Sequence, residues 1–439
     1  MKKLLFFVLL ISFSLEEGIF KKSERSKHGE DCVSDSACEE GLFCRLNRCM
    51  TNYESKNMKT LGLQDKNLCD LVKLCPANKK CVKHRCEDNI TLAIETPKNN
   101  TENETDVNLL FAGTVLLGQK AYKSGVGLND TFNYDHLFLN ISKDIKSADL
   151  SIIAQETVFH INPEETKFPK KLTNTPKELG DSIANAGFKV VLHGSMYSYG
   201  QKEKGINNTI NFWKTKYPNI TVLGISNTLE ESQKDYYIYV RNNLKIGIIN
   251  FSGFSSSSIP KKNAFMVNTI NKKKLEECVS KLKQETDFII VCISWGEKGG
   301  QFPNKKQIGL AKLIASYGVD LIVGNHPIMV QPVSYIKSDN GNKTLVFWSL
   351  GLFVGDDKKA NSNIGALANI IISKGSGKAY LSSYNLIPII NHKIDNRNYT
   401  VYKLSDYTEE LGLQADKKFT LKKAKETCTK LMGSFAHCD

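Results

Sequence analysis

Five loops of this chain carry the residues that could do chemistry. Each is rich in glycine and polar side chains and follows a short apolar run: 113–114, 155–157, 193–200, 294–299 and 325–327. They contain two glutamates, Glu156 and Glu297, and two histidines, His193 and His326. In α/β folds, active-site residues gather on loops that follow strands. Carboxylates and imidazoles in such loops are typical of hydrolysis, with or without a bound divalent metal ion.

The apolar runs before these loops, and four others, predict β-strands. The predicted strands are 108–112, 150–154, 188–192, 220–223, 244–251, 288–293, 319–323, 344–348 and 366–372. Between the earlier strands, four segments place apolar residues on one helical face. These faces are Leu179, Ile183 and Ala186; Ile206, Ile210, Trp213 and Tyr217; Leu275, Cys278, Val279 and Leu282; and Leu310, Leu313, Ile314 and Tyr317. Gly187 and Gly318 are placed to cap two of the helices. The domain is therefore predicted to be α/β in its first two thirds and β-rich afterwards.

Six motifs occur in a fixed order between about Leu109 and Val354. They cover 113–118, 149–156, 187–200, 294–298, 318–328 and 348–353. Together they resemble the motifs of the CapA, or poly-γ-glutamate capsule synthesis, family (PGA_cap), within the calcineurin-like metallophosphoesterase superfamily. The resemblance covers more than half of the chain. It implies an α/β fold, a metallophosphatase-like two-sheet sandwich flanked by helices (α-β-β-α), here preceded by a small disulfide-rich module.

The superfamily holds two metal ions with Asp, Asn and His side chains, and this chain departs from that pattern at nearly every such position. Where the resemblance implies ligands, the chain has Thr114, Ala154, Gly194, Ser195, Ser198, Ser294 and Ile328. Neutral hydroxyls hold divalent cations poorly. An intact two-metal hydrolase is therefore not expected.

The polar residues that the resemblance keeps are Glu156, Glu297 and His326, and these are the candidate catalytic residues. Glu156, His193 and His326 are the candidates for holding a single metal ion. An ordinary structural role is also open to each kept residue, because Glu156 could cap a turn, Glu297 could be solvated and His326 could bond within its loop.

We expect a CapA-like protein that binds a ligand and is non-catalytic or weakly catalytic, a pseudoenzyme. No cofactor is expected, and a divalent metal ion is the open alternative. The alternative is an active metal-dependent hydrolase that acts on phosphoesters or a poly-γ-glutamyl polymer. A third interpretation gives the binding to the N-terminal cysteine repeat. The expected partner is an extracellular polymer or protein. The formal charge of +13 favours anionic partners in a salt-dependent way, and no nucleic-acid-binding motif is present.

The N-terminus has the pattern of a secretory signal peptide, predicted at residues 1–17. Two lysines precede an apolar run from Leu4 to Leu15, which is too short to span a membrane. No later stretch of the sequence is apolar and long enough to span a bilayer. Secretion into the extracellular space is therefore expected.

Cysteines predict a tandem repeat over residues 30–87. Two units, 32–49 and 69–86, share the spacing C-x5-C-x5-C-x4-C: Cys32, Cys38, Cys44, Cys49 and Cys69, Cys75, Cys81, Cys86. Such short units need covalent bridges, and zinc sites normally use closer ligand pairs, so disulfides are expected. The pairing within a unit stays open.

Four cysteines lie outside the repeat. Cys428 and Cys438 are expected to close a small loop by a disulfide, whereas Cys278 and Cys292 could pair or remain buried thiols.

A linker is predicted at 88–107, because this stretch is rich in Asn, Thr and Glu without helical or strand periodicity. Its sequons at Asn89, Asn99 and Asn103 are the expected glycosylation sites. The CapA-like domain is then assigned to 108–395 and a C-terminal extension to 396–439.

Overall fold

The computed structural model describes residues 105–438 apart from 128–130, 161–173, 255–258, 357–362, 395–398 and 416–418, together with four short strands nearer the N-terminus. The predicted signal peptide, the three predicted glycosylation sites and Cys32, Cys38, Cys69 and Cys75 lie outside the described residues. The chain divides into two units, 1–68 and 69–439. Within the described residues, no helix has the length and apolar character needed to cross a bilayer.

Each cysteine unit contains one β-hairpin. β1 (Leu42–Arg45) pairs antiparallel with β2 (Arg48–Thr51), and β3 (Lys79–Val82) pairs in the same way with β4 (Arg85–Asp88). The register places Cys44 opposite Cys49 and Cys81 opposite Cys86. The same hairpin thus occurs at the same place in both repeats.

The first main sheet has eight strands, with the order β10-β9-β6-β5-β18-β19-β20 and β17 paired to β5. β10, β9, β6 and β5 run parallel, while β18, β19 and β20 add on antiparallel. The bounds are β5 Thr105–Leu116, β6 Leu150–Gln155, β9 Val190–Leu192, β10 Thr221–Leu223, β17 Leu352–Gly355, β18 Ile364–Lys374, β19 Tyr380–Lys393 and β20 Tyr399–Lys403.

The second main sheet has six strands in the order β11-β12-β13-β14-β16-β15. Its four central strands are parallel, and an antiparallel strand closes each edge. The bounds are β11 Tyr236–Arg241, β12 Leu244–Ser252, β13 Phe288–Ser294, β14 Leu321–Asn325, β15 Val330–Lys337 and β16 Lys343–Leu350. A separate short pair joins β7 (Val158–Phe159) to β8 (Asn174–Thr175).

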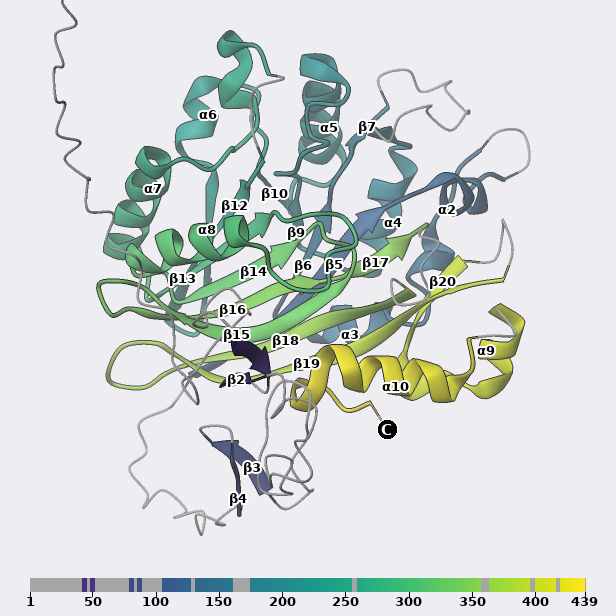
Figure 1. The fold of residues 1–439 in the computed structure, drawn as a ribbon. Helices are drawn as coiled ribbons and strands as arrows, with labels where there is room; N and C mark the ends of the chain where they lie inside the picture. The colour runs from purple at the N-terminus through teal and green to yellow at the C-terminus, as the bar shows by residue number, and fades with distance from the viewer. Residues whose placement is uncertain are drawn as a thin grey trace, which may run out of the picture. The chain divides into compact units, whose positions relative to one another are not determined.

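Helices cover the outer faces of both sheets (Figure 1). They are α2 Gln119–Ser124, α3 Ser142–Ser147, α4 Glu178–Ala186, α5 Lys202–Lys216, α6 Leu229–Gln233, α7 Lys272–Glu285 and α8 Lys305–Ser316. Two further helices, α9 Glu409–Ala415 and α10 Leu421–Met432, instead pack against the apolar cluster between the two sheets.

Successive side chains of a strand point to opposite faces of its sheet, and this produces three apolar layers: one between the two sheets and one between each sheet and its helices. In β5, Leu109 and Phe111 pack with residues of the second sheet, whereas Leu110 packs with Ile145 and Ile183 of helices α3 and α4. A further cluster joins the second sheet to α7 and α8. The predicted arrangement of two sheets flanked by helices is therefore confirmed.

The strands and helices predicted from periodicity are all present, but some details differ. Gly187 ends α4 in the left-handed conformation, with φ 106°, as expected of a glycine cap. The four residues of the predicted α8 face all contact the core cluster of the second sheet, Ile314 fully buried and the other three partly buried. The helix also turns Gln307 and Ala311 inward.

Two strands of the first sheet extend past the predicted domain boundaries. β5 begins at Thr105, inside the predicted linker 88–107, since residues 105–107 pair with the end of β18. β20 lies beyond residue 395 yet pairs with β19, so the first sheet continues into the predicted C-terminal extension.

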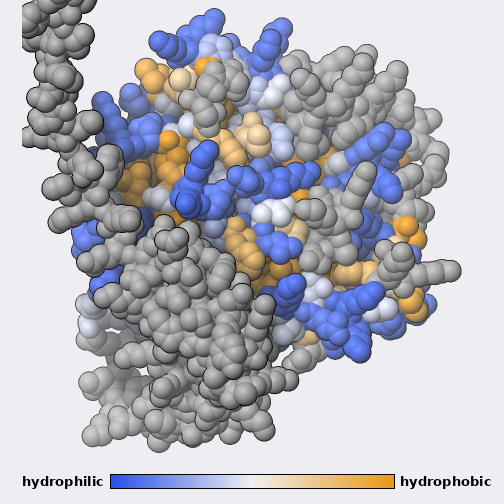
Figure 2. Space-filling model, in the orientation of Figure 1, coloured by the Kyte–Doolittle hydropathy of each residue, from blue (hydrophilic) through white to orange (hydrophobic). Residues whose placement is uncertain are grey.

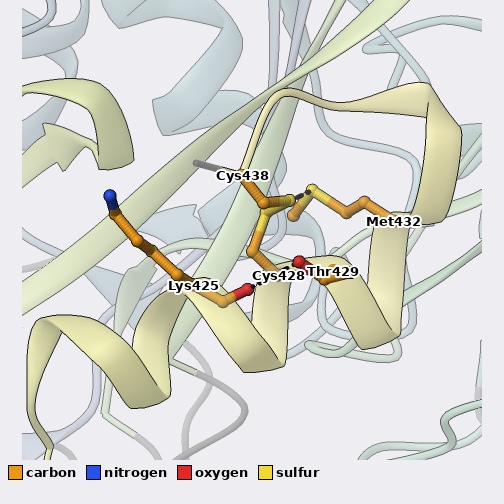
Figure 3. Close-up of a disulfide and its surroundings, with 5 residues drawn as sticks. All are labelled: Lys425, Cys428, Thr429, Met432 and Cys438. Atoms are coloured by element: carbon orange, nitrogen blue, oxygen red, sulfur yellow. Dashed lines mark hydrogen bonds between the residues drawn. A yellow bond between two sulfur atoms is a disulfide. The ribbon is translucent and has the colours of Figure 1, made fainter. Parts of the chain in front are cut away.

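A disulfide between Cys428 and Cys438 closes the C-terminal loop after α10, as the spacing predicts (Figure 3). Both sulfurs are buried, and Met432 Sδ lies 3.9 Å from Cys428 Sγ. α10 packs beside β15 and β18. Cys278 and Cys292 are separate buried thiols, which decides between the two alternatives that the sequence left open.

Candidate functional site

Glu156 is the centre of the site, and both of its carboxylate oxygens are in contact with neighbouring side chains. Oε2 lies 2.8 Å from Nδ1 of His326, and Oε1 accepts hydrogen bonds from Ser294 at 3.3 Å and, at the long limit of 3.5 Å, from Thr114. Glu156 and His326 are 1% and 3% exposed. Residues from four of the predicted loops that follow strands therefore meet at Glu156.

The four side chains come from neighbouring ends of parallel strands in both sheets. Thr114 lies beside an irregularity in β5, and Glu156 follows β6 in the same sheet. Ser294 ends β13, and His326 follows β14 in the second sheet. Parallel strands present their carboxyl ends at one edge, so residues distant in sequence meet there.

Two backbone features fix the positions of Thr114 and His326: a close approach of two chain segments at Gly113 and a positive φ at His326. Thr114 N donates to Gly351 O at 2.9 Å, and a Cβ on Gly113 would lie 2.4 Å from that same oxygen, so only glycine fits at 113. His326 has φ 95°, which is uncommon for a residue with a side chain. Its backbone N–H donates to Thr114 Oγ1 at 3.1 Å, which holds this conformation.

Polar groups in the loop after β9 make hydrogen bonds to neighbouring backbone and side-chain atoms. Ser195 Oγ donates to the backbone oxygen of Glu156 at 2.6 Å, and Ser198 Oγ donates to the backbone oxygen of His193. Gly194 N donates to Asn250 Oδ1 at 2.7 Å. The family resemblance implies an Asn-His pair at Gly194 and Ser195, and in this chain both residues make hydrogen bonds that fix the loop.

His193 does not join Glu156 and His326. The indole N–H of Trp213 in α5 donates to its Nε2 at 3.1 Å, and its ring lies 6.1 Å from that of Phe159 between centroids. Complete burial lowers the pKa of His193 to about 3. A neutral ring whose Nε2 already accepts from Trp213 does not offer that nitrogen to a metal, so the structure does not support His193 as a ligand.

Glu297 is also outside the cluster. Its side chain is exposed, although its loop is fixed near His326 by a hydrogen bond of 2.8 Å from Gly299 N to Pro327 O. In the described part of the chain, the Glu297 carboxylate makes no hydrogen bond or ion pair with Glu156 or His326. Gly300 N closes a turn on the backbone oxygen of Glu297, and this turn leaves the side chain in solvent.

Two aromatic residues that the sequence analysis did not select lie against His326. The ring of Phe254 makes an edge contact with a centroid distance of 4.6 Å, and that of Tyr197 lies at 5.9 Å. Burial and the charge of Glu156 raise the pKa of the Tyr197 hydroxyl. Because active-site residues gather on loops that follow strands, the loop after the predicted strand 244–251 could have pointed to Phe254.

The donor set does not fit a pair of divalent cations. Among the described residues, no group of three or more His, Cys, Asp or Glu side chains is placed to hold a metal ion. The cluster offers one carboxylate, already bonded to His326, and neutral hydroxyls. Asn325 Oδ1 is buried without a hydrogen-bond partner in the described structure, but one amide oxygen cannot supply the six or more ligands that Mg²⁺ or Ca²⁺ needs.

Comparison with known proteins decides the family. Residues 108–357 match the family described as bacterial capsule synthesis protein PGA_cap, which is more than half of the chain. The chain belongs to this family. Its matched range agrees with the six motifs seen in the sequence, so the resemblance to CapA is confirmed.

Two relatives of this PGA_cap chain are capsule proteins of bacilli. It is 23% identical over 302 residues to the PGA biosynthesis protein CapA of Bacillus subtilis (strain 168), covering 68% of this chain and 75% of that protein. It is 24% identical over 281 residues to the capsule biosynthesis protein CapA of Bacillus anthracis, covering 62% and 65%. It is also similar to the calcineurin-like phosphoesterase YfkN from Bacillus subtilis, with 13% identity, coverage of 65% and 90%, and a TM-score of 0.37.

Proposed function

We propose that this PGA_cap protein is secreted and acts as a binding protein that does not cleave its ligand. The observation that carries the proposal is the pairing of Glu156 with His326. A metal ion at this carboxylate would have to replace a buried hydrogen bond of 2.8 Å with His326.

The physical argument concerns charge. Two divalent cations need several anionic ligands to offset the loss of their hydration. Thr114, Ser195 and Ser294 supply no charge, and their hydroxyls already bond to Glu156 or its backbone. A cluster with this composition keeps the fold and lacks the electrostatics of two-metal hydrolysis.

An extracellular polymer or protein is the proposed ligand. The aromatic rings of Tyr197 and Phe254 supply apolar contact area around His326. The formal charge of +13 favours an anionic ligand. Hydrophilic and apolar side chains are interspersed over the visible face of the described residues (Figure 2).

Two features support secretion. The first 17 residues have the composition of a signal peptide, and the buried Cys428–Cys438 disulfide is typical of proteins from oxidising compartments.

The test is a melting curve with and without a chelator, and with added manganese or zinc, together with a phosphoesterase assay on p-nitrophenyl phosphate. We expect the melting temperature to change by less than about 1 °C and no metal-dependent turnover. The proposal is overturned if a metal raises the melting temperature or gives turnover in the wild type but not in Glu156→Gln.

A further inference from the structure

A cavity separate from Glu156 and His326 lies where the edges of the two main sheets meet. Its volume is about 720 Å³, and its walls come from α5, α6, β10 and the start of β11. β10 ends the first sheet and β11 ends the second, and these two edge strands are in contact. In Figure 1, α5 and α6 lie beside this junction.

One wall of the cavity carries a carboxyl group with one buried oxygen that lacks a hydrogen-bond partner among the described residues. Asp235 directly precedes β11 and is 6% exposed. Its Oδ1 accepts from Gly224 N at 3.0 Å, whereas Oδ2 is buried and has no hydrogen-bond partner within the described part of the chain. A buried, unsatisfied carboxyl oxygen carries a desolvation penalty, which a donor from a ligand would remove.

The other charged groups of the lining make no hydrogen bond to Asp235 Oδ2. Glu231 bonds to Lys214 at 2.5 Å and to the backbone N–H of Asn227 at 2.9 Å. Glu230 and Lys234 are exposed. Burial raises the pKa of Asp235 to about 7, although the hydrogen bond from Gly224 N and the charge of Lys274 in α7 lower it, and the charge of Glu231 raises it further. The thiol of Cys278 in α7 is also close enough to interact with Asp235.

The remaining lining is mostly apolar and partly rigid. Ile210 and Trp213 of α5 contribute one side, and Leu223 and Ile225 contribute another. Trp213 is held by its hydrogen bond to His193. The cavity thus combines an apolar wall with one carboxyl oxygen, Asp235 Oδ2, that has no hydrogen-bond partner among the described residues.

We propose that this cavity binds a small organic ammonium ligand with an apolar body, whose N–H groups pair with Asp235 Oδ2. An ammonium group satisfies the unpaired oxygen and offsets its charge, while the apolar body covers the partly buried side chains of Ile220 and Val222. This proposal does not depend on the function proposed for the Glu156 site.

The probe is 2-phenylethylammonium, and 2-phenylethanol is its neutral match. Calorimetric titration of the full chain should show binding of the ammonium and at least tenfold weaker binding of the alcohol. Affinity should rise from pH 6 to pH 8, because Asp235 loses its proton over this range while the ammonium keeps its charge. Equal binding of both probes, or binding of neither, overturns the proposal.

Asp235→Asn and Glu230→Gln are the matched variants. Asn keeps the acceptor for Gly224 N and removes the charge, so ammonium binding should weaken by about 10- to 100-fold. Glu230 is an exposed residue of the same lining, and its variant should bind within about twofold of the wild type. Melting curves show whether each variant is folded, and a folded Asp235→Asn protein with unchanged affinity contradicts the assignment.

Discussion

Glu156 and His326 form a buried contact of 2.8 Å that joins the end of a strand in one sheet to the end of a strand in the other. The two residues are 170 positions apart in the sequence. The contact occupies the carboxylate that a metal would need, and it also links the two halves of the sandwich. Its removal should therefore affect stability.

Glu156→Gln should lower the free energy of unfolding by about 1–3 kcal/mol, because it removes the charge from a buried hydrogen-bonded pair but keeps the side-chain shape. Urea unfolding followed by tryptophan fluorescence measures this, since all three tryptophans, Trp213, Trp295 and Trp348, lie in the large unit. Glu297→Gln is the same change at an exposed site and should stay within about 0.5 kcal/mol of the wild type. Equal losses in the two variants would argue against a structural role for the pair.

Two buried groups should give opposite pH dependences of stability. Burial lowers the pKa of His193 from 6.5 to about 3, so its stability contribution is complete above pH 6.5 and is lost as the pH falls. Burial raises the pKa of Asp235 from 3.8 to about 7, so its contribution is complete below pH 3.8 and is lost as the pH rises through 7. Between pH 4 and 6.5 the two effects oppose each other.

The matched variants separate them. Relative to the wild type, His193→Gln should lose the rise of stability with pH, and Asp235→Asn should make that rise steeper, each by about 1 kcal/mol per pH unit. Unfolding free energies at half-unit intervals provide the measurement, and differences from the wild type cancel the other titrating groups. Parallel curves for all three proteins would show that these groups do not titrate as their burial implies.

The double variant Cys428→Ala/Cys438→Ala should lower the free energy of unfolding by about 2–3 kcal/mol beyond the loss of the buried sulfurs, because the cross-link closes a loop with a sequence separation of 10. Cys278→Ala/Cys292→Ala is the control, since it removes two thiols of the same burial, 5% and 0% exposed, without breaking a bond. If the control loses as much stability, the cross-link does not stabilise the domain. Peptide mass spectrometry without reductant should find Cys428 and Cys438 in one linked pair.

Local patterns predicted much of the fold. The spacing of Leu179, Ile183 and Ala186 predicted the buried face of α4, and the following Gly187 adopts the left-handed cap. In α8 the apolar pattern did not mark Gln307, whose side chain is buried and hydrogen-bonded to Gln331 in β15. A periodicity of apolar residues cannot detect a buried polar contact of this kind.

The sequence by itself determined the alternation of strands and helices, the family motifs in their order and the loops that follow the strands, because these depend on neighbours within a few residues. Only the tertiary structure decided which loop residues touch. It placed His326 on Glu156, turned His193 toward Trp213 and left Glu297 in solvent. These outcomes depend on strand order and on side-chain direction at each strand end, which are set by packing between residues that lie 20 positions apart for His193 and Trp213 and 170 positions apart for Glu156 and His326.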